Sequence, residues 1–456
     1  MILSFSLSNF RSFNEEETIS FVASKRLAGT HDDHLIPIPD TREHVLRCAV
    51  LYGANGGGKS NLFKALRYLS TLATEPRPRN GGTGREPFRL GGDGAQPSTF
   101  DLQFVVAGKV YRYGLDVLDE RIAEEWLVRK NGARETRIFE RTTNALGQVH
   151  VDLGTRPGRN EKLAALATVG GPPNQSFLAT ANNILGAEAA GEEISEVLAW
   201  LKTDLVFFGP DTEFGLLAPL LEADGTFRKF AGEFLRLSGT GIERLEVQRY
   251  QLTEAEFRLL VGDNSAEEYL HRLRDTQEDS ALIKVGDNRE IVLERHDGSV
   301  SISDIRIRAA HQEGSAAPNL DLADESDGTR RLLHLLPALD RERAAGKTFF
   351  IDEIDRSLHP ILAREFLAGF LKSAGVGSQL IVTTHESSLL DQDLLRRDEV
   401  WFVEKDQNQA SRLYSLADFK VRKDLELRKH YLQGRFGAVP FIGDLAGSVL
   451  SATGQK

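Results

Sequence analysis

The stretch CAVLYGANGGGKS, residues 48–60, joins an apolar run to a glycine-rich turn. Its last eight residues fit the phosphate-loop pattern G-x-x-x-x-G-K-[S/T]. Residues 59–72 continue with apolar side chains at helical spacing. A glycine-rich turn without a ligand is the alternative interpretation. The position of the turn between an apolar strand and an amphipathic helix favours a nucleotide site.

The residue types in this loop suit phosphate binding. Glycines let successive backbone N–H groups turn toward the phosphates, and the start of the helix adds its positive dipole end. Lys59 is expected to reach the β- and γ-phosphates of ATP, and the Ser60 hydroxyl is expected to ligate Mg²⁺. The predicted nucleotide-binding residues are Gly53, Asn55, Gly56, Gly57, Gly58, Lys59 and Ser60.

A second half of the site is predicted where the apolar run 348–351 ends in two carboxylates, Asp352 and Glu353. Asp352 would hold Mg²⁺ directly or through water, and Glu353 would orient and deprotonate the attacking water. The alternative is a buried strand with acidic residues at its exposed end. The phosphate loop upstream favours the catalytic interpretation.

Two further segments carry polar residues at the ends of predicted elements. The apolar run 379–384 ends at His385, which either senses the γ-phosphate or caps the strand structurally. Ser326 and Thr329 open a helix that runs through the leucines at 332–336, and both are good helix-capping types. A helix N-terminus is itself an anion site, so capping and a phosphate contact are compatible.

Composition places the chain among ordinary globular proteins. It has 456 residues, 41% hydrophobic and 27% charged, which predicts two or three structural units. One cysteine, Cys48, excludes an intramolecular disulfide, and no signal peptide or long apolar run is visible. We therefore expect a cytoplasmic protein without a membrane partner. The net charge of −11 opposes wholesale wrapping of nucleic acid but leaves room for a local basic groove.

The order of patterns along the chain predicts an α/β fold. No heptad pattern is sustained, so no long coiled coil is expected. The phosphate loop comes first and the carboxylate strand last, which indicates one ATPase core with a mixed sheet and flanking helices, split by an inserted α+β lobe. The expected parts are the N-terminal half of the core (1–150), the inserted lobe (151–320) and the C-terminal half with a basic tail (321–456).

This order of motifs resembles the ABC-type ATPase heads of the SMC, RecF and OLD group. The residues that carry the resemblance are 7–13, the loop 53–61, the Asp352-Glu353 pair, Asp355 and His385. More narrowly, the chain resembles the coiled-coil-free phage-defence ATPases of the RloA and AbiLi type, including the ATPase subunit of PARIS systems. The closer resemblance lies in residues 325–331, 358–360, 383–387 and 431–440.

The resemblance implies an ABC-type head that dimerises as a sandwich around two ATP molecules. Ser326 and Gly328 would approach the γ-phosphate from the partner, His385 would approach it in its own chain, and Asp355 would link the sites. Asn61 would belong to the nucleotide loop. Arg11 either touches nucleotide or has a surface role. The signature Ser-Asp-Gly-Thr at 326–329 departs from the transporter form Ser-Gly-Gly-Gln, and the glutamine of the Q-loop is not placed.

The function that this resemblance implies is an ATP-hydrolysing switch. It would sense a phage trigger and control a separate effector, such as a Toprim nuclease, in antiphage defence. The alternative is a RecF-like repair ATPase that binds DNA without a dedicated effector. A nucleotide-binding scaffold without turnover is a third hypothesis, against which Asp352, Glu353 and His385 argue.

Three further features receive plainer interpretations. The cluster His31-Asp32-Asp33-His34 has metal-ligand residue types, but no matching partner is visible, so it is interpreted as a solvated loop. Glu404 resembles the first acidic residue of a Toprim nuclease, yet only 71 residues follow His385, and we expect no nuclease activity in this chain. A group of basic residues lies near the C-terminus: Arg422, Lys423, Arg428, Lys429 and Arg435. One interpretation is a binding surface for nucleic acid or for a partner protein, and the alternative is a solvated helix face.

Overall fold

The structure is a computed structural model of the whole chain, in which two compact units are distinguished. Unit 1 comprises residues 1–210, 341–355 and 363–456, and unit 2 comprises residues 211–340 and 356–362. The structure describes residues 1–91, 94–132, 134–156, 159–186, 188–210, 214–215, 217–275, 279–285, 289–296, 299–311, 319–373, 375–420 and 425–440. Among them, no helix has the length and apolar character needed to cross a membrane.

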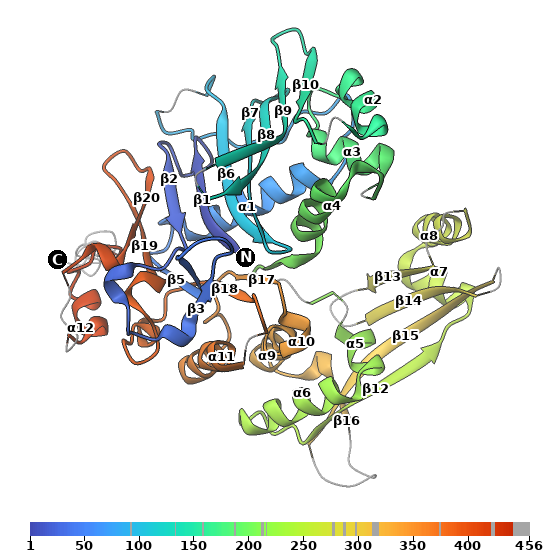
Figure 1. Ribbon diagram of the computed structural model, residues 1–456. Helices are drawn as coiled ribbons and strands as arrows, with labels where there is room; N and C mark the ends of the chain where they lie inside the picture. The colour runs from blue at the N-terminus through green and yellow to red at the C-terminus, as the bar shows by residue number, and fades with distance from the viewer. Residues whose placement is uncertain are drawn as a thin grey trace, which may run out of the picture. The chain divides into compact units, whose positions relative to one another are not determined.

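A six-stranded sheet forms the centre of unit 1 (Figure 1). Its first five strands are parallel and the last is antiparallel, in the order β11 (Leu205–Phe208), β17 (Thr348–Ile351), β18 (Gln379–Thr384), β5 (Cys48–Tyr52), β19 (Val400–Lys405) and β20 (Ser411–Ser415). Strands β5, β17 and β18 are buried along their whole length. This explains their continuous apolar runs, because parallel strands are covered on both faces.

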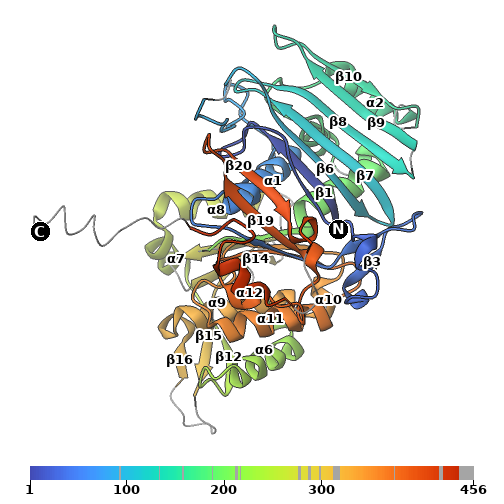
Figure 2. The same cartoon turned by 90° about the vertical axis from the view of Figure 1, so that its left-hand side faces the viewer.

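A seven-stranded antiparallel sheet forms the second layer of unit 1 (Figure 2). Its order is β10 (Val149–Leu153), β9 (Arg134–Thr143), β8 (Ile122–Asn131), β7 (Lys109–Val117), β6 (Ser98–Val106), β1 (Ile2–Ser8) and β2 (Glu17–Ser20). Buried and less buried residues alternate along β1 and β6. That is the pattern of strands with one face toward a core.

Helix α1 (Lys59–Thr74) packs against both sheets of unit 1. Phe63 meets Phe207 of the parallel sheet with ring centroids 5.3 Å apart. Tyr68 meets Phe100 of the antiparallel sheet at 5.5 Å. The helix that begins at the phosphate loop is therefore held on two sides by aromatic contacts.

The remaining elements of unit 1 surround these sheets. They are the hairpin β3 (Leu35–Pro37) and β4 (His44–Leu46), and the helices α2 (Glu161–Val169), α3 (Phe177–Leu185), α4 (Glu192–Ala199), α10 (Arg341–Ala344), most of α11 (Pro360–Ser373) and α12 (Leu427–Leu432).

Unit 2 is an antiparallel sheet with helices. The strands are β12 (Arg244–Gln251), β15 (Ser299–Ala310), β14 (Arg289–His296) and β13 (Ser280–Val285), with β16 (Asn319–Asp321) paired to β15. The helices are α5 (Leu217–Ala223), α6 (Gly225–Leu237), α7 (Glu254–Val261), α8 (Asp263–Asp275) and α9 (Asp327–Leu335). Part of its core consists of Phe257 and Leu270 from α7 and α8, packed with Ile291 and Ile302 from the sheet.

The α/β fold class is confirmed, with a mixed sheet that carries the phosphate loop. The longest helix in the described residues is α1, with 16 residues, so the described part of the chain contains no long coiled coil. The compact units divide the chain at other positions than the expected boundaries at 150 and 320. Helices α2, α3 and α4 lie in unit 1, because Leu163, Phe177 and Leu198 belong to the same hydrophobic core as the antiparallel sheet.

Candidate nucleotide site

The phosphate loop follows β5 in the middle of the parallel sheet and leads into α1. Glycine is required at two of its positions by close contacts. A Cβ on Gly53 would lie 2.3 Å from the Val403 carbonyl oxygen. A Cβ on Gly58 would lie 2.2 Å from Ser411 Oγ, and Gly58 also has a φ of +122°. The glycines therefore let the loop lie directly on β19 and β20.

Hydrogen bonds from distant segments hold the loop in place. Ser411 Oγ donates to the Gly57 carbonyl at 2.6 Å, and the Ser411 N–H donates to the Ser12 carbonyl at 2.7 Å. The Asn61 side-chain amide donates to Ser12 Oγ at 2.9 Å. Asn61 thus ties the first turn of α1 to the N-terminal segment.

The loop presents backbone donors for an anion. In the described part of the chain, the N–H groups of Gly56 and Gly58 donate to no protein group. The N–H groups of Lys59 and Ser60 open α1, where no intrahelical acceptor exists. Four donors at the positive end of a 16-residue helix are an arrangement that favours an anion such as phosphate.

Lys59 lies at the centre of the polar site. Its Nζ donates to the Gly53 carbonyl at 2.8 Å and lies 3.1 Å from His385 Nε2. Burial lowers the Lys59 pKa to about 8, although the nearby carboxylates, Asp352 first, act in the opposite direction. Burial and the neighbouring Lys59 charge both lower the pKa of His385. The imidazole is therefore neutral near pH 7 and accepts from the lysine.

Thr383, at the end of β18, joins the two carboxylate residues. Its hydroxyl donates to Asp352 Oδ1 at 2.5 Å and accepts from the Glu353 backbone N–H at 2.8 Å. Asp352 is buried, and Glu353 has a left-handed backbone with a φ of 51°. Two adjacent strand ends therefore fix the direction in which the acidic pair leaves the sheet.

Asp355 lies next to the histidine. The His385 N–H points at the Asp355 carboxylate, with Oδ2 at 3.3 Å. The structure thus brings Lys59, Asp352, Glu353, Asp355 and His385 together, although they follow three strands, β5, β17 and β18, that are distant in sequence. Ser60, half-buried, is the second residue of α1.

Ser326 and Gly328 lie in unit 2, at the start of α9. Ser326 is the N-cap, and its Oγ accepts from the Thr329 N–H at 3.2 Å. The capping interpretation is therefore confirmed. A Cβ on Gly328 would lie 2.4 Å from the Ser357 carbonyl oxygen, so the glycine lets the helix start lie against that segment of unit 2.

Arg11 occupies a tight turn after β1, with a φ of 51°. Its guanidinium pairs with Glu86, and its backbone N–H donates to the Glu86 carbonyl at 2.7 Å. The guanidinium also lies over the Phe10 ring, 5.9 Å from its centroid. A nucleotide contact by Arg11 would have to compete with the Glu86 ion pair.

Glu404 has a structural partner in the C-terminal tail. Its carboxylate accepts from the Ala438 N–H at 2.8 Å, and Gly437 packs against the same carboxyl group. Phe436 stacks on Phe402 of β19 with centroids 6.0 Å apart. In this arrangement Glu404 anchors the tail to the sheet.

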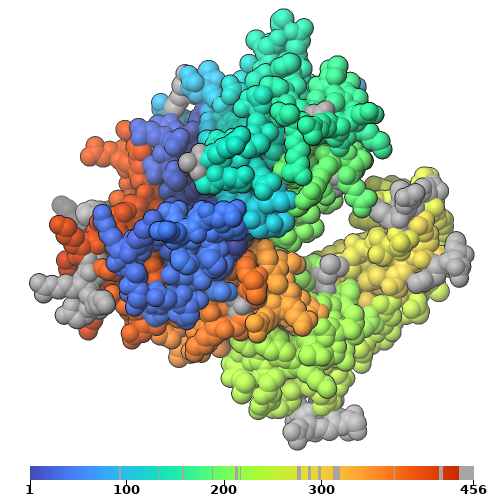
Figure 3. Space-filling model, in the orientation of Figure 1, coloured from blue at the N-terminus to red at the C-terminus, as the bar shows by residue number. Residues whose placement is uncertain are grey.

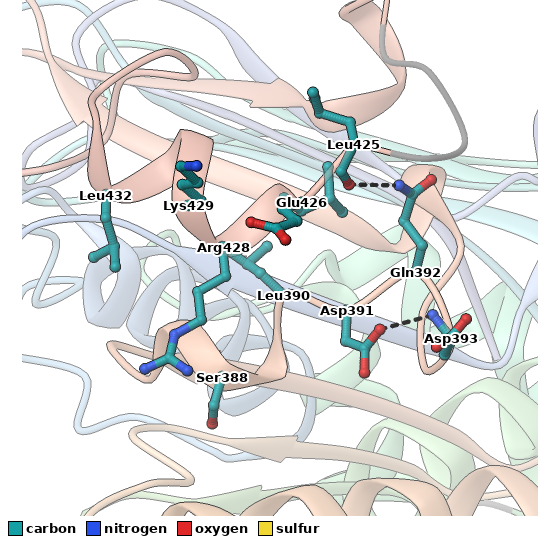
Figure 4. A pocket seen from close by; sticks show the side chains of 11 residues that line it. Ser388, Leu390, Asp391, Gln392, Asp393, Leu425, Glu426, Arg428, Lys429 and Leu432 are labelled. Atoms are coloured by element: carbon teal, nitrogen blue, oxygen red, sulfur yellow. Dashed lines mark hydrogen bonds between the residues drawn. The ribbon is translucent and has the colours of Figure 1, made fainter.

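Two of the basic residues near the C-terminus, Arg428 and Lys429, border a pocket of about 700 Å³ (Figure 4). Arg428 and Lys429, on α12, line it together with Ser388, and Gln392 donates to the Leu425 carbonyl at 3.0 Å across one side. Arg435 is exposed. Arg422 and Lys423 lie outside the described residues.

The interpretation of residues 31–34 as a solvated loop is wrong for His34. Its side chain is only 5% exposed, and Nδ1 lies 3.0 Å from Glu399, whose side chain is fully buried. The partner that was not visible in the sequence lies 365 residues away. Charged partners at such separation leave no local signal.

Sequence reasoning missed three residues that organise the nucleotide site: Ser12, Thr383 and Ser411. Thr383 carries a usable signal, because a hydroxyl at the end of an otherwise apolar parallel strand points toward a ligand edge. Ser12 and Ser411 carry none. They act through contacts with the loop glycines that only the tertiary fold creates.

A glycine-rich loop lies between the parallel strand β5 and a helix, and an acidic pair follows β17 of the same sheet, with β18 between the two strands. This combination defines the chain as a P-loop ATPase with a nucleotide as its ligand. The family model described as "AAA domain, putative AbiEii toxin, Type IV TA system" matches residues 48–147 and 217–391, more than half of the chain. The chain belongs to this family of ATPase domains.

The solved structures that match this chain include SMC head domains. The SMC head domain from Thermotoga maritima has 14% sequence identity and a TM-score of 0.35, covering 91% of this chain and 98% of that one. An SMC head bound to the C-winged helix domain of ScpA has 15% identity and a TM-score of 0.38, with coverages of 91% and 97%. The Smc head domain from Pyrococcus furiosus has 13% identity and a TM-score of 0.35, with coverages of 95% and 98%. No curated protein gives a significant match.

Proposed function

We propose that this chain is an ATP-hydrolysing molecular switch that dimerises around ATP and controls a separate effector in antiphage defence. The observation that carries the ATPase part is the hydrogen-bonded group of Lys59, His385 and Asp355 beside Thr383 with its acidic pair. Each of these side chains stands at the carboxyl end of a parallel strand, in the loop that follows it or, for Lys59, at the start of the helix after that loop. That edge is where open α/β sheets bind ligands.

The donor set fits ATP with Mg²⁺. Ser60 supplies a hydroxyl oxygen and Asp352 a carboxylate oxygen, and hard oxygen ligands are those that Mg²⁺ prefers. The buried Asp352 carboxylate is oriented by the Thr383 hydroxyl, so it needs little reorganisation to act as a ligand. When bound, Mg²⁺ neutralises charge on the phosphates.

Glu353 is the proposed general base. Its left-handed backbone turns its side chain away from the direction that the strand would give it, and such strained conformations often occur at functional sites. Glu353 would take a proton from the attacking water, while Lys59 and the loop N–H groups hold the phosphates. Neutral His385 would approach the γ-phosphate as a hydrogen-bonding group.

The dimer part of the proposal rests on the start of α9. Ser326 and Gly328 stand at the N-terminus of a nine-residue helix, a position that favours an anion. In the proposed sandwich they contact the γ-phosphate bound by the partner, and Asp355 links the two sites. ATP binding would favour the closed dimer, and hydrolysis would release it.

The defence role follows the family description, which names a putative AbiEii toxin of a toxin–antitoxin system. We propose that this chain senses the phage trigger in the cytoplasm. The killing chemistry belongs to a separate effector, such as a Toprim nuclease, and this chain has no nuclease activity. Glu404 supports the last point, because its carboxylate already holds the tail through Ala438.

The test is Glu353→Gln, which removes the base and keeps the size of the side chain. The variant is expected to lose turnover, to retain ATP and to accumulate as a dimer with Mg-ATP. ATPase rate and light-scattering mass with and without ATP measure these effects. Hydrolysis at the wild-type rate would overturn the role of Glu353. Strong stimulation of the wild-type ATPase by DNA alone, with steep salt dependence, would instead favour the DNA-repair alternative.

A further inference from the structure

The segment at residues 31–34 gathers metal-ligating side chains away from the nucleotide site. One ligand atom each from His31, Asp33 and His34 lies within 4.8 Å of the others. Among the described residues, this is the one group of three or more His, Cys, Asp or Glu side chains close enough together to hold a metal ion. Two of the side chains are accessible: Asp33 is exposed and His31 partly so. The N-terminal part of the chain, drawn in blue, is exposed on the face in Figure 3.

The hydrogen bonds of both histidines fix their tautomers. His31 Nε2 lies 2.8 Å from the Gln392 carbonyl oxygen, which can only accept, so Nε2 carries the proton. This leaves the lone pair on His31 Nδ1 free for a ligand. The other ring nitrogen of a metal-bound histidine commonly donates to a backbone carbonyl in this way.

His34 is oriented by a carboxylate. Its Nδ1 lies 3.0 and 3.1 Å from the two oxygens of Glu399, and Glu399 also accepts from the Arg396 N–H at 2.8 Å. With Glu399 as acceptor, Nδ1 is the donor and the lone pair remains on Nε2. A carboxylate behind a histidine is the arrangement that orients zinc ligands and raises their basicity.

Buried ion pairs hold the loop in this conformation. The Arg396 guanidinium is fully buried, pairs with Asp398 at 3.0 Å and donates to the carbonyls of Leu27 and Thr30. His31 itself has a left-handed backbone, with a φ of 46°, and its ring stacks on His34 with centroids 4.9 Å apart. Buried ion pairs and hydrogen bonds thus position the ligand side chains.

We propose that His31, Asp33 and His34 form a binding site for a divalent transition metal of the Zn²⁺ class. Two imidazoles and one carboxylate are the ligand types that such ions prefer over Mg²⁺. Ligand atoms around a tetrahedral Zn²⁺ lie about 3.3 Å apart, so closure takes side-chain shifts on the order of 1 Å. A water molecule would supply the fourth ligand.

This site would stabilise a connection within unit 1. The two groups that orient the histidines, the Gln392 carbonyl and Glu399, belong to the segment between β18 and β19. A metal on the cluster would favour the loop conformation in which His31 and His34 contact that segment. Because it binds the folded chain, it would raise the unfolding temperature.

The experiment uses the full chain, stripped of metal and free of nucleotide, and titrates it with Zn²⁺ by calorimetry. Co²⁺, followed by its visible absorption, reports the geometry of the site. The expected result is one ion per chain. Asp33→Asn and His31→Asn are expected to weaken binding by at least about tenfold, since each removes one of three ligands. His44→Asn, at an exposed histidine of β4, is the matched control and should bind like the wild type.

Glu399→Gln and a double variant of two ligands separate a built site from adventitious binding, and Lys59→Ala separates it from the nucleotide site. Glu399→Gln is expected to weaken binding about 10- to 100-fold, as second-layer substitutions do. Lys59→Ala should leave Zn²⁺ binding unchanged and lose nucleotide, which keeps this test independent of the proposed ATPase. Equal affinity in the wild type and in the His31→Asn/Asp33→Asn double variant would overturn the proposal. The double variant decides the question even if Glu399→Gln fails to fold.

Discussion

Lys59 is the residue whose charge state governs the first step of the proposed cycle. Its Nζ is held by the Gly53 carbonyl and by neutral His385, and burial lowers its pKa to about 8. Phosphate binding requires the ammonium form. Nucleotide binding above that pH must therefore be accompanied by proton uptake.

We predict that ATP affinity is constant below about pH 8 and weakens above it, by up to tenfold per pH unit, because one proton is taken up on binding. Calorimetry between pH 7 and 9.5, in buffers of different ionisation enthalpy, measures both affinity and proton uptake. Lys59→Arg is the matched control, since a guanidinium stays charged throughout this range. A wild-type affinity that does not change with pH would contradict the lysine assignment.

Thr383 links the proposed metal ligand to the proposed base. Thr383→Val keeps the shape of the side chain but removes the hydroxyl that contacts Asp352 and the Glu353 N–H. We predict a 10- to 100-fold lower ATPase rate with little change in ATP affinity, the size of effect expected for a positioning residue. Thr383→Ser should restore the rate. Failure of the serine variant to do so would indicate a packing role for the methyl group instead.

At the scale of elements, the start of α9 depends on a close contact within unit 2. Gly328 has an ordinary backbone but no room for a side chain, because a Cβ would lie 2.4 Å from the Ser357 carbonyl oxygen. An added methyl group must displace the helix start or the segment that follows Asp355. Either movement disturbs Ser326, the cap of the same helix.

Gly328→Ala is therefore predicted to lower ATP hydrolysis and ATP-dependent dimerisation while leaving ATP binding to the monomer unchanged. The expected destabilisation of unit 2 is about 1–3 kcal/mol, typical of overpacking. Urea unfolding, ATP titration and light scattering measure the three quantities. Asp327→Ala is the control, because Asp327 is the exposed neighbour in the same turn. Loss of ATP binding in Gly328→Ala would mean that its effect reaches the phosphate loop in the monomer.

Elements set by local pattern could be predicted from the sequence. Apolar periodicity and glycine placement predict strand β5 with its loop and α1, and the strand before Asp352. The contacts of Ser12 with Ser411 and of His34 with Glu399 could not, because they join residues 399 and 365 positions apart. The sequence also could not predict that α2–α4 belong to unit 1, because an apolar helix face does not indicate which sheet it covers.

The whole molecule divides the proposed catalytic groups between two compact units. Unit 1 contains the phosphate loop, the acidic pair and His385, while unit 2 contains Ser326 and Gly328. In a sandwich dimer, each ATP would meet unit 1 of one chain and unit 2 of the other. This arrangement predicts complementation between two inactive variants.

Lys59→Ala and Ser326→Arg are each predicted to be inactive alone. Mixed together, they are expected to recover up to about a quarter of the wild-type ATPase rate, because half of the dimers are mixed and each of those has one intact site. Titration of one variant into the other, followed by phosphate release, measures the recovery. A mixture as inactive as its components, at concentrations where dimers form, would contradict contact in trans.

The contacts of β19 and β20 with the phosphate loop also determine when the ATP site can form during synthesis of the chain. Strand β5 is bordered by β18 and β19, and the loop glycines rest on Val403 and Ser411, all made more than 300 residues after the loop itself. Until those residues leave the ribosome, β5 lacks its neighbouring strands and the loop lacks its contact with Ser411. Contacts between residues so far apart in sequence form late in folding. A chain that stops before residue 411 therefore carries the complete phosphate-loop motif and still lacks a formed ATP site.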